Sequence, residues 1–144
     1  MEAPSGRTGE DTPGGRADPP PALVRYATEV TAVGPLIPEF RAQGLLVFFG
    51  EAAPEELHDF VILHRPSVVH SAPSPGDVVE LAGEPFRVTA VGHVVPENLL
   101  RLGHASVKAD GATSPPMPGD ICVEAKPLPD LAPRSTVRIL AAPA

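Results

Sequence analysis

PFRVTAVGHVVPENLLRLGHASVKA, residues 85–109, contains the unit from which we predict the fold. Its first part, PFRVTAV, alternates apolar with polar side chains, which is the two-residue period of a half-buried strand. Pro96 then suits the first turn of a short helix, and Gly103 suits the position where a helix ends. The closing run HASVKA has apolar residues typical of a strand. The segment therefore predicts a strand, a turn, a short helix and a second strand.

A weaker copy of this unit lies earlier in the chain. VTAVG occurs at residues 30–34 and again at 88–92, and a Pro-Glu pair follows each copy at the same spacing. Gly44 and Gly103 then each precede an apolar strand. We therefore predict two related halves, each built as strand, turn, helix and strand. A barrel assembled from two such halves leaves few strand edges exposed, a problem that small β-proteins must manage.

Short strand candidates bounded by turn residues recur over the rest of the chain. Residues 83–84, Gly-Glu, indicate a tight hairpin turn, and Pro-Gly-Asp triplets at 75–77 and 118–120 each precede a strand. Short helices are expected at 54–58 and 96–102. We predict an all-β fold, a compact closed β-barrel of about six to eight strands with one or two short helices. The strand candidates are residues 24–33, 45–49, 59–64, 77–82, 85–91, 104–109, 120–125 and 135–141.

The composition favours short elements in one domain. The chain has 144 residues, of which 20 are proline and 13 are glycine, so long helices are disfavoured. Only 4% of the residues are aromatic while 42% are hydrophobic, so aliphatic side chains must build the core. Residues 1–22 contain no Val, Leu, Ile or aromatic residue, and we expect a disordered tail there. Residues 23–144 are expected to form the folded domain.

Charge and motif content exclude several classes of function. A net charge of −7 argues against nucleic-acid binding, which requires clustered Lys and Arg. No run reaches the ~20 apolar residues of a membrane-spanning helix, so we expect a cytoplasmic protein without membrane insertion. The sequence has no Gly-rich phosphate loop and no hydrolase elbow, and we expect no cofactor. The single cysteine, Cys122, is interpreted as a small core residue.

The histidines are the candidates for chemistry. They form no HxH or HExxH pattern, so no metal site is expected unless the fold brings separate ligands together. His58 and His70 are expected in surface loops. His93 follows a turn and His104 opens a predicted strand, so either could face His64 across a barrel mouth. The five histidines are His58, His64, His70, His93 and His104.

His64 closes the predicted strand DFVILH. Pro66 biases Arg65 away from helix and should end regular strand pairing, so we expect His64 where the strand leaves the sheet. Functional side chains are common at such positions. From the residues alone, an ordinary and partly exposed strand-end histidine is the simpler interpretation.

Several longer runs can be taken together: VTAVGPLIPEF (30–40), LLVFFGEAAPEELHDFVILH (45–64), FRVTAVGHVVPENLLRLGHASVKADG (86–111) and PGDICVEA (118–125). They resemble the glucitol/sorbitol-specific enzyme IIA component of the bacterial sugar phosphotransferase system, and the resemblance covers nearly all of residues 24–140. It implies a compact β-barrel that relays a phosphoryl group. It also implies that the histidine closing the run after the acidic APEEL segment, here His64, carries that group.

The resemblance implies two protein partners and a direction of transfer. Phosphorylated HPr, a histidine phosphocarrier protein, would donate to His64, and the IIB cysteine of the membrane IIB/IIC sorbitol transporter would accept. The implied activity is that of a protein-Nπ-phosphohistidine–sugar phosphotransferase component. Family members often carry a second histidine two places further on, where this chain has Pro66. His104 is the candidate to supply that supporting role.

A histidine suits such a relay because neutral imidazole both attacks phosphorus and leaves it near neutral pH. Two partners must reach it in turn, so we expect a shallow apolar collar that includes Phe60, Ile62 or Val68. Open strand edges would also allow a homodimer. Two alternatives stay open: a regulatory binding barrel that has lost the relay, and a histidine-based metal enzyme on the same fold.

Overall fold

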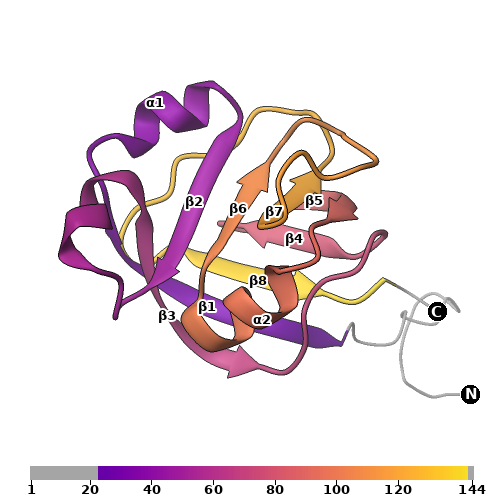
Figure 1. Cartoon of the computed structure of the whole chain (residues 1–144), viewed down its shortest axis with the longest axis horizontal. Coiled ribbons are helices and arrows are strands. Elements are labelled where there is room, and N and C mark those ends of the chain that lie inside the picture. The colour runs from indigo at the N-terminus through magenta and orange to yellow at the C-terminus, as the bar shows by residue number, and fades with distance from the viewer. Residues whose placement is uncertain (1–22, 143–144) are drawn as a thin grey trace, which may run out of the picture.

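Eight strands close into a barrel in the computed structural model, which describes residues 23–142 (Figure 1). Neighbouring strands follow the order β1-β3-β2-β6-β7-β5-β4-β8 around the barrel. The predicted closed all-β barrel with short helices is confirmed. The elements are β1 (Val24–Val33), α1 (Ile37–Ala42), β2 (Leu45–Gly50), the 3₁₀ helix η1 (Glu55–Phe60), β3 (Ile62–Val69), β4 (Val78–Leu81), β5 (Glu84–Val91), α2 (Val95–Leu102), β6 (Ala105–Lys108), β7 (Asp120–Val123) and β8 (Thr136–Leu140).

The barrel consists of two halves with the same topology. The first half contributes β1 to β4 with α1, and the second contributes β5 to β8 with α2. β2 pairs in parallel with β3 as β6 pairs in parallel with β7, and β2 meets β6 in antiparallel pairing between the halves. Exchanging the two halves leaves the strand order unchanged. The repeat predicted from VTAVG is therefore present in three dimensions as a pseudo-twofold arrangement.

The pseudo-twofold arrangement extends to the strand registers. Val30 on β1 pairs with His64 on β3, and Val88 on β5 pairs with Val123 on β7. Since Val30 and Val88 are the first residues of the two VTAVG copies, His64 and Val123 occupy equivalent places. In the second half, the position equivalent to His64 is therefore occupied by an ordinary core residue, Val123.

Aliphatic side chains from both halves fill the barrel, and only four of the described polar or charged residues are buried: Thr28, His64, Asp77 and Asp120. The two aspartates are explained by local structure. Each closes one of the predicted Pro-Gly-Asp turns, accepts the backbone N–H three residues earlier and pairs with a basic side chain. Thr28 and His64 are the buried polar residues that no turn explains.

β3 differs from the strand predicted at 59–64. Residues 55–60 form η1, and the strand begins at Ile62 and continues past Pro66. Pro66 is tolerated because β2 pairs with β3 only as far as His64, so the missing N–H costs no ladder bond on that side. A shift in the β1–β3 register accompanies the proline. Pairing therefore ends before Pro66 on the β2 side but continues past it on the β1 side, so the prediction is confirmed only in part, and His64 lies within the strand.

The hairpin between β4 and β5 turns one residue earlier than predicted, at Ala82 and Gly83 instead of Gly83 and Glu84. Both turn residues have positive φ, 51° for Ala82 and 86° for Gly83, as type I′ hairpin turns require. The other predicted strands and both predicted helical segments agree with the structure within about two residues. Local sequence therefore predicts most elements, whereas β3 differs from its prediction and the helix α1 was implied only by the repeat.

Replacing Ala82 by asparagine is expected to stabilise the protein by about 0.5–1 kcal/mol. Ala82 is exposed and has positive φ, which asparagine tolerates better than alanine. Urea unfolding of both proteins measures the difference in free energy. Ala52→Asn is a matched control, because Ala52 is also exposed but has no positive φ. An Ala82→Asn protein no more stable than the wild type would contradict the turn geometry.

Barrel closure gives every strand two neighbours in the ring of strands within residues 23–142. Pairing with β2 covers β3 only as far as His64, so the rest of β3 keeps an open edge on that side, and the homodimer stays a prediction. Over the same residues, no helix is both long enough and apolar enough to cross a membrane. The tail expected at residues 1–22 lies outside the described residues.

Candidate functional site

His64 lies inside the barrel. It sits on β3 between β1 and β2, and it is only 1% exposed. Strand alternation explains this orientation, because Ile62 and His64 face inward while Leu63 and Arg65 face outward. The expectation of a partly exposed histidine at a strand end was wrong, since β3 continues beyond it.

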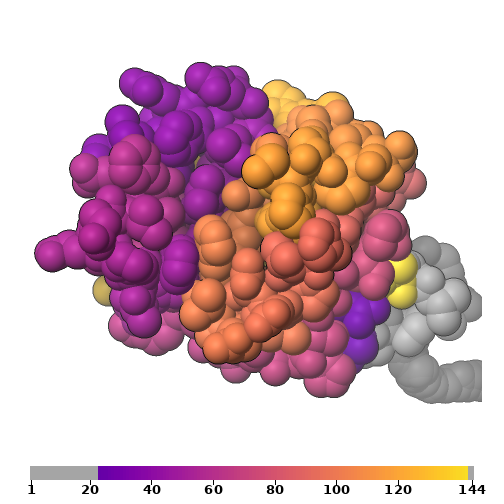
Figure 2. Space-filling model, in the orientation of Figure 1, coloured from indigo at the N-terminus to yellow at the C-terminus, as the bar shows by residue number. Residues whose placement is uncertain are grey.

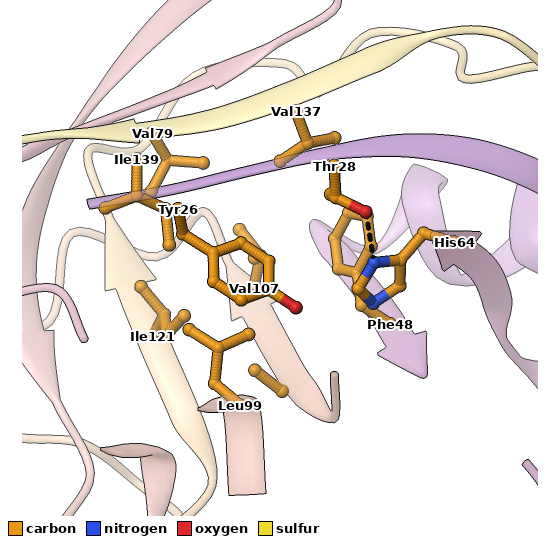
Figure 3. A pocket seen from close by; sticks show the side chains of 11 residues that line it. Tyr26, Thr28, Phe48, His64, Val79, Leu99, Val107, Ile121, Val137 and Ile139 are labelled. Atoms are coloured by element: carbon orange, nitrogen blue, oxygen red, sulfur yellow. Dashed lines mark hydrogen bonds between the residues drawn. The ribbon is translucent and has the colours of Figure 1, made fainter. Parts of the chain in front are cut away.

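Both ring nitrogens of His64 have hydrogen-bond partners. Nδ1 lies 2.6 Å from Oγ1 of Thr28, and Nε2 lies 2.7 Å from the carbonyl oxygen of Gly103. A carbonyl oxygen only accepts, so Nε2 carries a proton and donates it. In the neutral ring, Nδ1 then holds the lone pair and accepts a hydrogen bond from the Thr28 hydroxyl (Figure 3). The two contacts fix the tautomer and the orientation of the imidazole.

The surroundings of His64 favour its neutral form. The rings of Tyr26 and Phe48 stand edge-on to the imidazole, with centroids 6.3 and 5.9 Å away. Burial lowers the pKa of His64 below its usual range and outweighs the opposing effects of the Gly103 hydrogen bond and the Glu51 charge. At neutral pH the imidazole is therefore uncharged, which is the form that acts as a nucleophile.

Acidification is expected to destabilise the protein through His64. Because the folded-state pKa lies below the unfolded value of about 6.5, the unfolded chain binds the proton first as the pH falls. The contribution of His64 to stability is full above about pH 6.5 and declines below it, by at most about 1.4 kcal/mol per pH unit, until the buried ring itself protonates. Urea unfolding over a series of pH values measures this decline. In His64→Gln, the part of this decline that is due to His64 should be absent. If the free energy of unfolding changed with pH equally in both proteins, the proposed effect of His64 would be contradicted.

The second half of the barrel shows that this polar pair is not needed to fill the core. The registers place Thr28 and His64 at positions equivalent to Phe86 and Val123, which are both fully buried. Burying a hydroxyl and an imidazole is costly unless both are hydrogen-bonded, whereas an apolar pair packs without that cost. The polar pair in the first half therefore indicates a function.

A surface groove of about 220 Å³ reaches Gly103, the residue that accepts the Nε2 hydrogen bond. Thr28, on the Nδ1 side, adjoins a small internal cavity of about 30 Å³ instead (Figure 3). A molecule approaching through the groove would therefore meet Nε2 first, once the Gly103 carbonyl moves aside. Figure 2 shows the violet β2 segment and the orange α2–β6 segment meeting on this face. The groove is lined by Tyr26, Phe49, Gly50, Glu51, Ala52, Pro66 and residues 99–103.

Arg65, the cation nearest to His64 in the sequence, lies on the outer face of the barrel. Its guanidinium donates paired hydrogen bonds of 3.0 and 3.2 Å to Glu51, and these bonds hold the pKa of Glu51 below its usual range. Glu51 lines the groove, so this ion pair stands at the rim. Both side chains are exposed, and a surface pair of this kind exchanges partners at little cost.

His104 lies on the outer surface of β2 and β6. Its Nδ1 donates to the carbonyl oxygen of Phe48 at 3.2 Å, and its ring stacks on Phe49 with centroids 4.6 Å apart. Its neighbour Ala105 is buried, so alternation turns His104 away from the barrel interior. The structure does not bring His104 to the His64 ring, and its supporting role stays a prediction.

The remaining histidines also lie apart from His64. His70 and His93 are exposed, and His58 lies on η1 with Nε2 3.0 Å from the carbonyl oxygen of Ala53. His93 therefore does not face His64 across the barrel. Within the described part of the chain, no three His, Cys, Asp or Glu side chains gather in a way that could hold a metal ion.

The structure does not place the expected apolar collar around His64, since neither Phe60 nor Val68 lines the groove. Phe60 and Val68 are 43% and 37% exposed, but Ile62 is completely buried because it shares the inward face of β3 with His64.

Cys122 is buried, as expected for a core residue. Burial raises the pKa of its thiol to about 11, so Cys122 is not a nucleophile at neutral pH.

Sequence reasoning missed the groups that hold the His64 ring. Thr28 has a signal that could have revealed it: alignment of the two halves sets Thr28 against Phe86 at an inward strand position. The carbonyl of Gly103 has no such signal, because every residue carries one and only the fold places this one at Nε2.

A closed barrel of two related halves, with one neutral, tautomer-fixed histidine beside a groove, defines a small barrel domain with a single candidate nucleophile. Residues 25–138 match the family model described as "PTS system glucitol/sorbitol-specific IIA component", and the chain belongs to this family. The resemblance stated from the sequence is thereby confirmed.

Individual relatives agree with this assignment. The chain is 34% identical over 116 residues to the "PTS system glucitol/sorbitol-specific EIIA component" of Shigella flexneri and to that of Escherichia coli (strain K12). Each match covers 80% of this chain and 94% of the relative. The fold is similar to the crystal structure of a PTS system IIA component from Enterococcus faecalis V583, with a TM-score of 0.68 and 18% identity over 80% of this chain and 99% of that one.

Proposed function

We propose that this chain relays a phosphoryl group through His64. The observation that supports this most is the buried neutral imidazole, held in one tautomer where the other half of the barrel has Val123. Packing does not require a histidine there. A neutral imidazole is well suited to take up and release a phosphoryl group near neutral pH. Membership in a family of phosphotransferase IIA components supports the same role.

The proposed reaction requires the site to open at Gly103. In the closed structure Nε2 donates to the Gly103 carbonyl, so this nitrogen has no free lone pair. When the carbonyl withdraws, the proton on Nε2 can transfer to Nδ1, whose N–H then donates a hydrogen bond to Oγ1 of Thr28, and Nε2 becomes the nucleophile. Thr28 suits both states because a hydroxyl can donate to Nδ1 or accept from it.

Transfer then forms one bond and breaks another. Nε2 of His64 attacks phosphorus, and the electron pair of the cleaved P–N bond returns to the imidazole of the donor. The His64 ring becomes cationic, and the bond from Nδ1–H to Thr28 stabilises that charge. In the onward step a thiolate attacks phosphorus, and neutral His64 leaves with its electron pair on Nε2. Two cations stand at the groove for the phosphoryl oxygens: Arg101, which lines it, and Arg65, which pairs with the groove residue Glu51.

The proposed donor is phosphorylated HPr, and the proposed acceptor is the IIB cysteine of a sorbitol transporter, with the relay in the cytoplasm. The relatives from Shigella flexneri and Escherichia coli carry the glucitol/sorbitol name, which supports sorbitol as the sugar. Leu102 lines the groove and is 47% exposed, so it offers a partner an apolar contact beside Gly103. Transient interfaces of this kind are small.

Incubation with phosphoenolpyruvate, enzyme I and HPr tests the relay. We expect acid-labile phosphate on the chain only when all three components are present. Addition of the IIB domain should then remove the phosphate. A chain that takes up no phosphate under these conditions would overturn the proposal.

One observation favours the alternative of a regulatory binding barrel. His64 is 1% exposed and both ring nitrogens are engaged, so the site is closed. A barrel that had lost the relay would stay closed while still binding HPr or IIB. HPr binding measured beside phosphate uptake separates the two functions, because only the regulatory barrel would bind HPr without being labelled.

A further inference from the structure

The hydroxyl of Tyr26 is buried and has no hydrogen-bond partner among the described residues. Tyr26 is 2% exposed and shares the inward face of β1 with Thr28. Buried tyrosine hydroxyls normally have a partner, because removing an unpaired hydroxyl from water costs free energy. Phenylalanine would fill the same space without that cost. The hydroxyl of Tyr26 therefore needs an explanation other than packing.

Tyr26 stands between the internal cavity beside His64 and the surface groove. It lines both the cavity of about 30 Å³ and the groove of about 220 Å³. Its ring lies edge-on to that of His64 with centroids 6.3 Å apart, and its hydroxyl points toward the imidazole (Figure 3). A group that entered through the groove and bonded to Nε2 would lie against this hydroxyl.

The group that reaches Nε2 in the proposed relay carries negative charge on its oxygens. Such oxygens need hydrogen-bond donors, and positioned donors are the main contribution of a protein to phosphoryl transfer. The other side chains around the cavity do not supply a free donor, since Thr28 is bonded to Nδ1 and Phe48 and Leu99 are apolar. Burial raises the pKa of Tyr26 to about 12, so its hydroxyl keeps its proton at neutral pH.

We propose that the Tyr26 hydroxyl donates a hydrogen bond to a phosphoryl oxygen on Nε2 of His64. This inference rests on the proposed relay through His64 and adds a residue that touches the transferred group. Tyr26 keeps its proton throughout, and none of its own bonds is formed or broken. The free energy lost by burying an unpaired hydroxyl in the resting protein is recovered when phosphohistidine forms.

Tyr26→Phe removes this hydroxyl and leaves the ring. We expect phosphoryl uptake from phosphorylated HPr to slow by about 10- to 100-fold, while the melting temperature stays equal or rises. Thr89→Val is the matched control, because the Thr89 hydroxyl donates to the carbonyl oxygen of Ala112 at 2.6 Å in the other half. That variant should be less stable and take up phosphate at the wild-type rate. Wild-type uptake by Tyr26→Phe would overturn the inference and leave the relay intact.

A spectroscopic test reports the bond directly. Tyr26 is the only tyrosine in the chain, so tyrosine labelled with carbon-13 at Cζ gives a single NMR signal. We expect that signal to move when His64 is phosphorylated, and we expect the phosphorus signal to differ between the wild type and Tyr26→Phe. Unchanged signals on a fully phosphorylated chain would overturn the role of Tyr26 alone. A wild-type chain that takes up no phosphate would overturn the relay and this inference together.

Discussion

His64→Gln is expected to lose phosphoryl uptake from phosphorylated HPr by at least about 10³-fold. Glutamine keeps an N–H at the end of its side chain that can donate to the Gly103 carbonyl, as Nε2 does in the wild type. Its amide nitrogen has no lone pair available to attack phosphorus. The variant therefore removes the nucleophile while retaining most of the packing and one of the two hydrogen bonds.

Rates of label transfer at equal HPr concentration measure this loss, and circular dichroism confirms that the variant is folded. His104→Gln is the matched control, because His104 bonds Phe48 and stacks on Phe49 on the outer surface. We expect little change in that variant, and a large drop would instead support the helper role implied by the resemblance. Label that persists in His64→Gln would place the phosphorylated residue elsewhere.

Gly92→Ala is expected to destabilise the protein by about 3 kcal/mol or more. A Cβ at this position would lie 2.1 Å from the carbonyl oxygen of Pro118, and no side-chain rotation can relieve a clash with backbone. The same carbonyl accepts the N–H of Val94 at 3.1 Å, so the two segments are held together. Gly34, in the other VTAVG copy, is equally restricted, with a Cβ position 2.4 Å from the carbonyl oxygen of Asp59.

Urea unfolding of Gly92→Ala beside Gly119→Ala separates this clash from the general cost of replacing glycine. A Cβ at Gly119 would meet only Cγ2 of Val94 at 3.9 Å, an ordinary contact, and Gly119 has no positive φ. We expect Gly119→Ala to stay within about 1 kcal/mol of the wild type. Near-wild-type stability of Gly92→Ala would show that the two segments can separate without cost.

Most of the barrel could be predicted because its elements are specified by neighbouring residues. PFRVTAV has the alternation of a strand, and Gly103 ends α2 with a φ of 67° that glycine adopts readily. Gly34 and Gly92, the glycines of the two VTAVG copies, lie where the backbones of two segments of the same half pack closely against each other. These signals act over a few residues, so they can be read without knowledge of the remaining chain.

β3 could not be predicted in the same way. A proline such as Pro66 ends pairing in most strand contexts. Here the pairing between β2 and β3 stops at His64, so Pro66 has no β2 partner to lose. Whether a proline is tolerated thus depends on where a neighbouring strand stops. That information lies in the register between β2 and β3 and not in residues 59–66 themselves.

By itself, the sequence determined the two repeated units, the closed barrel and, through family resemblance, the choice of His64 among five histidines. Only the tertiary structure decided that His64 is buried, that Thr28 and Gly103 hold its two nitrogens, and that Tyr26 stands beside it. Alternation along a strand predicts which residues share a face. Which face is the interior, and which atoms meet there, depends on registers between strands that are distant in the sequence.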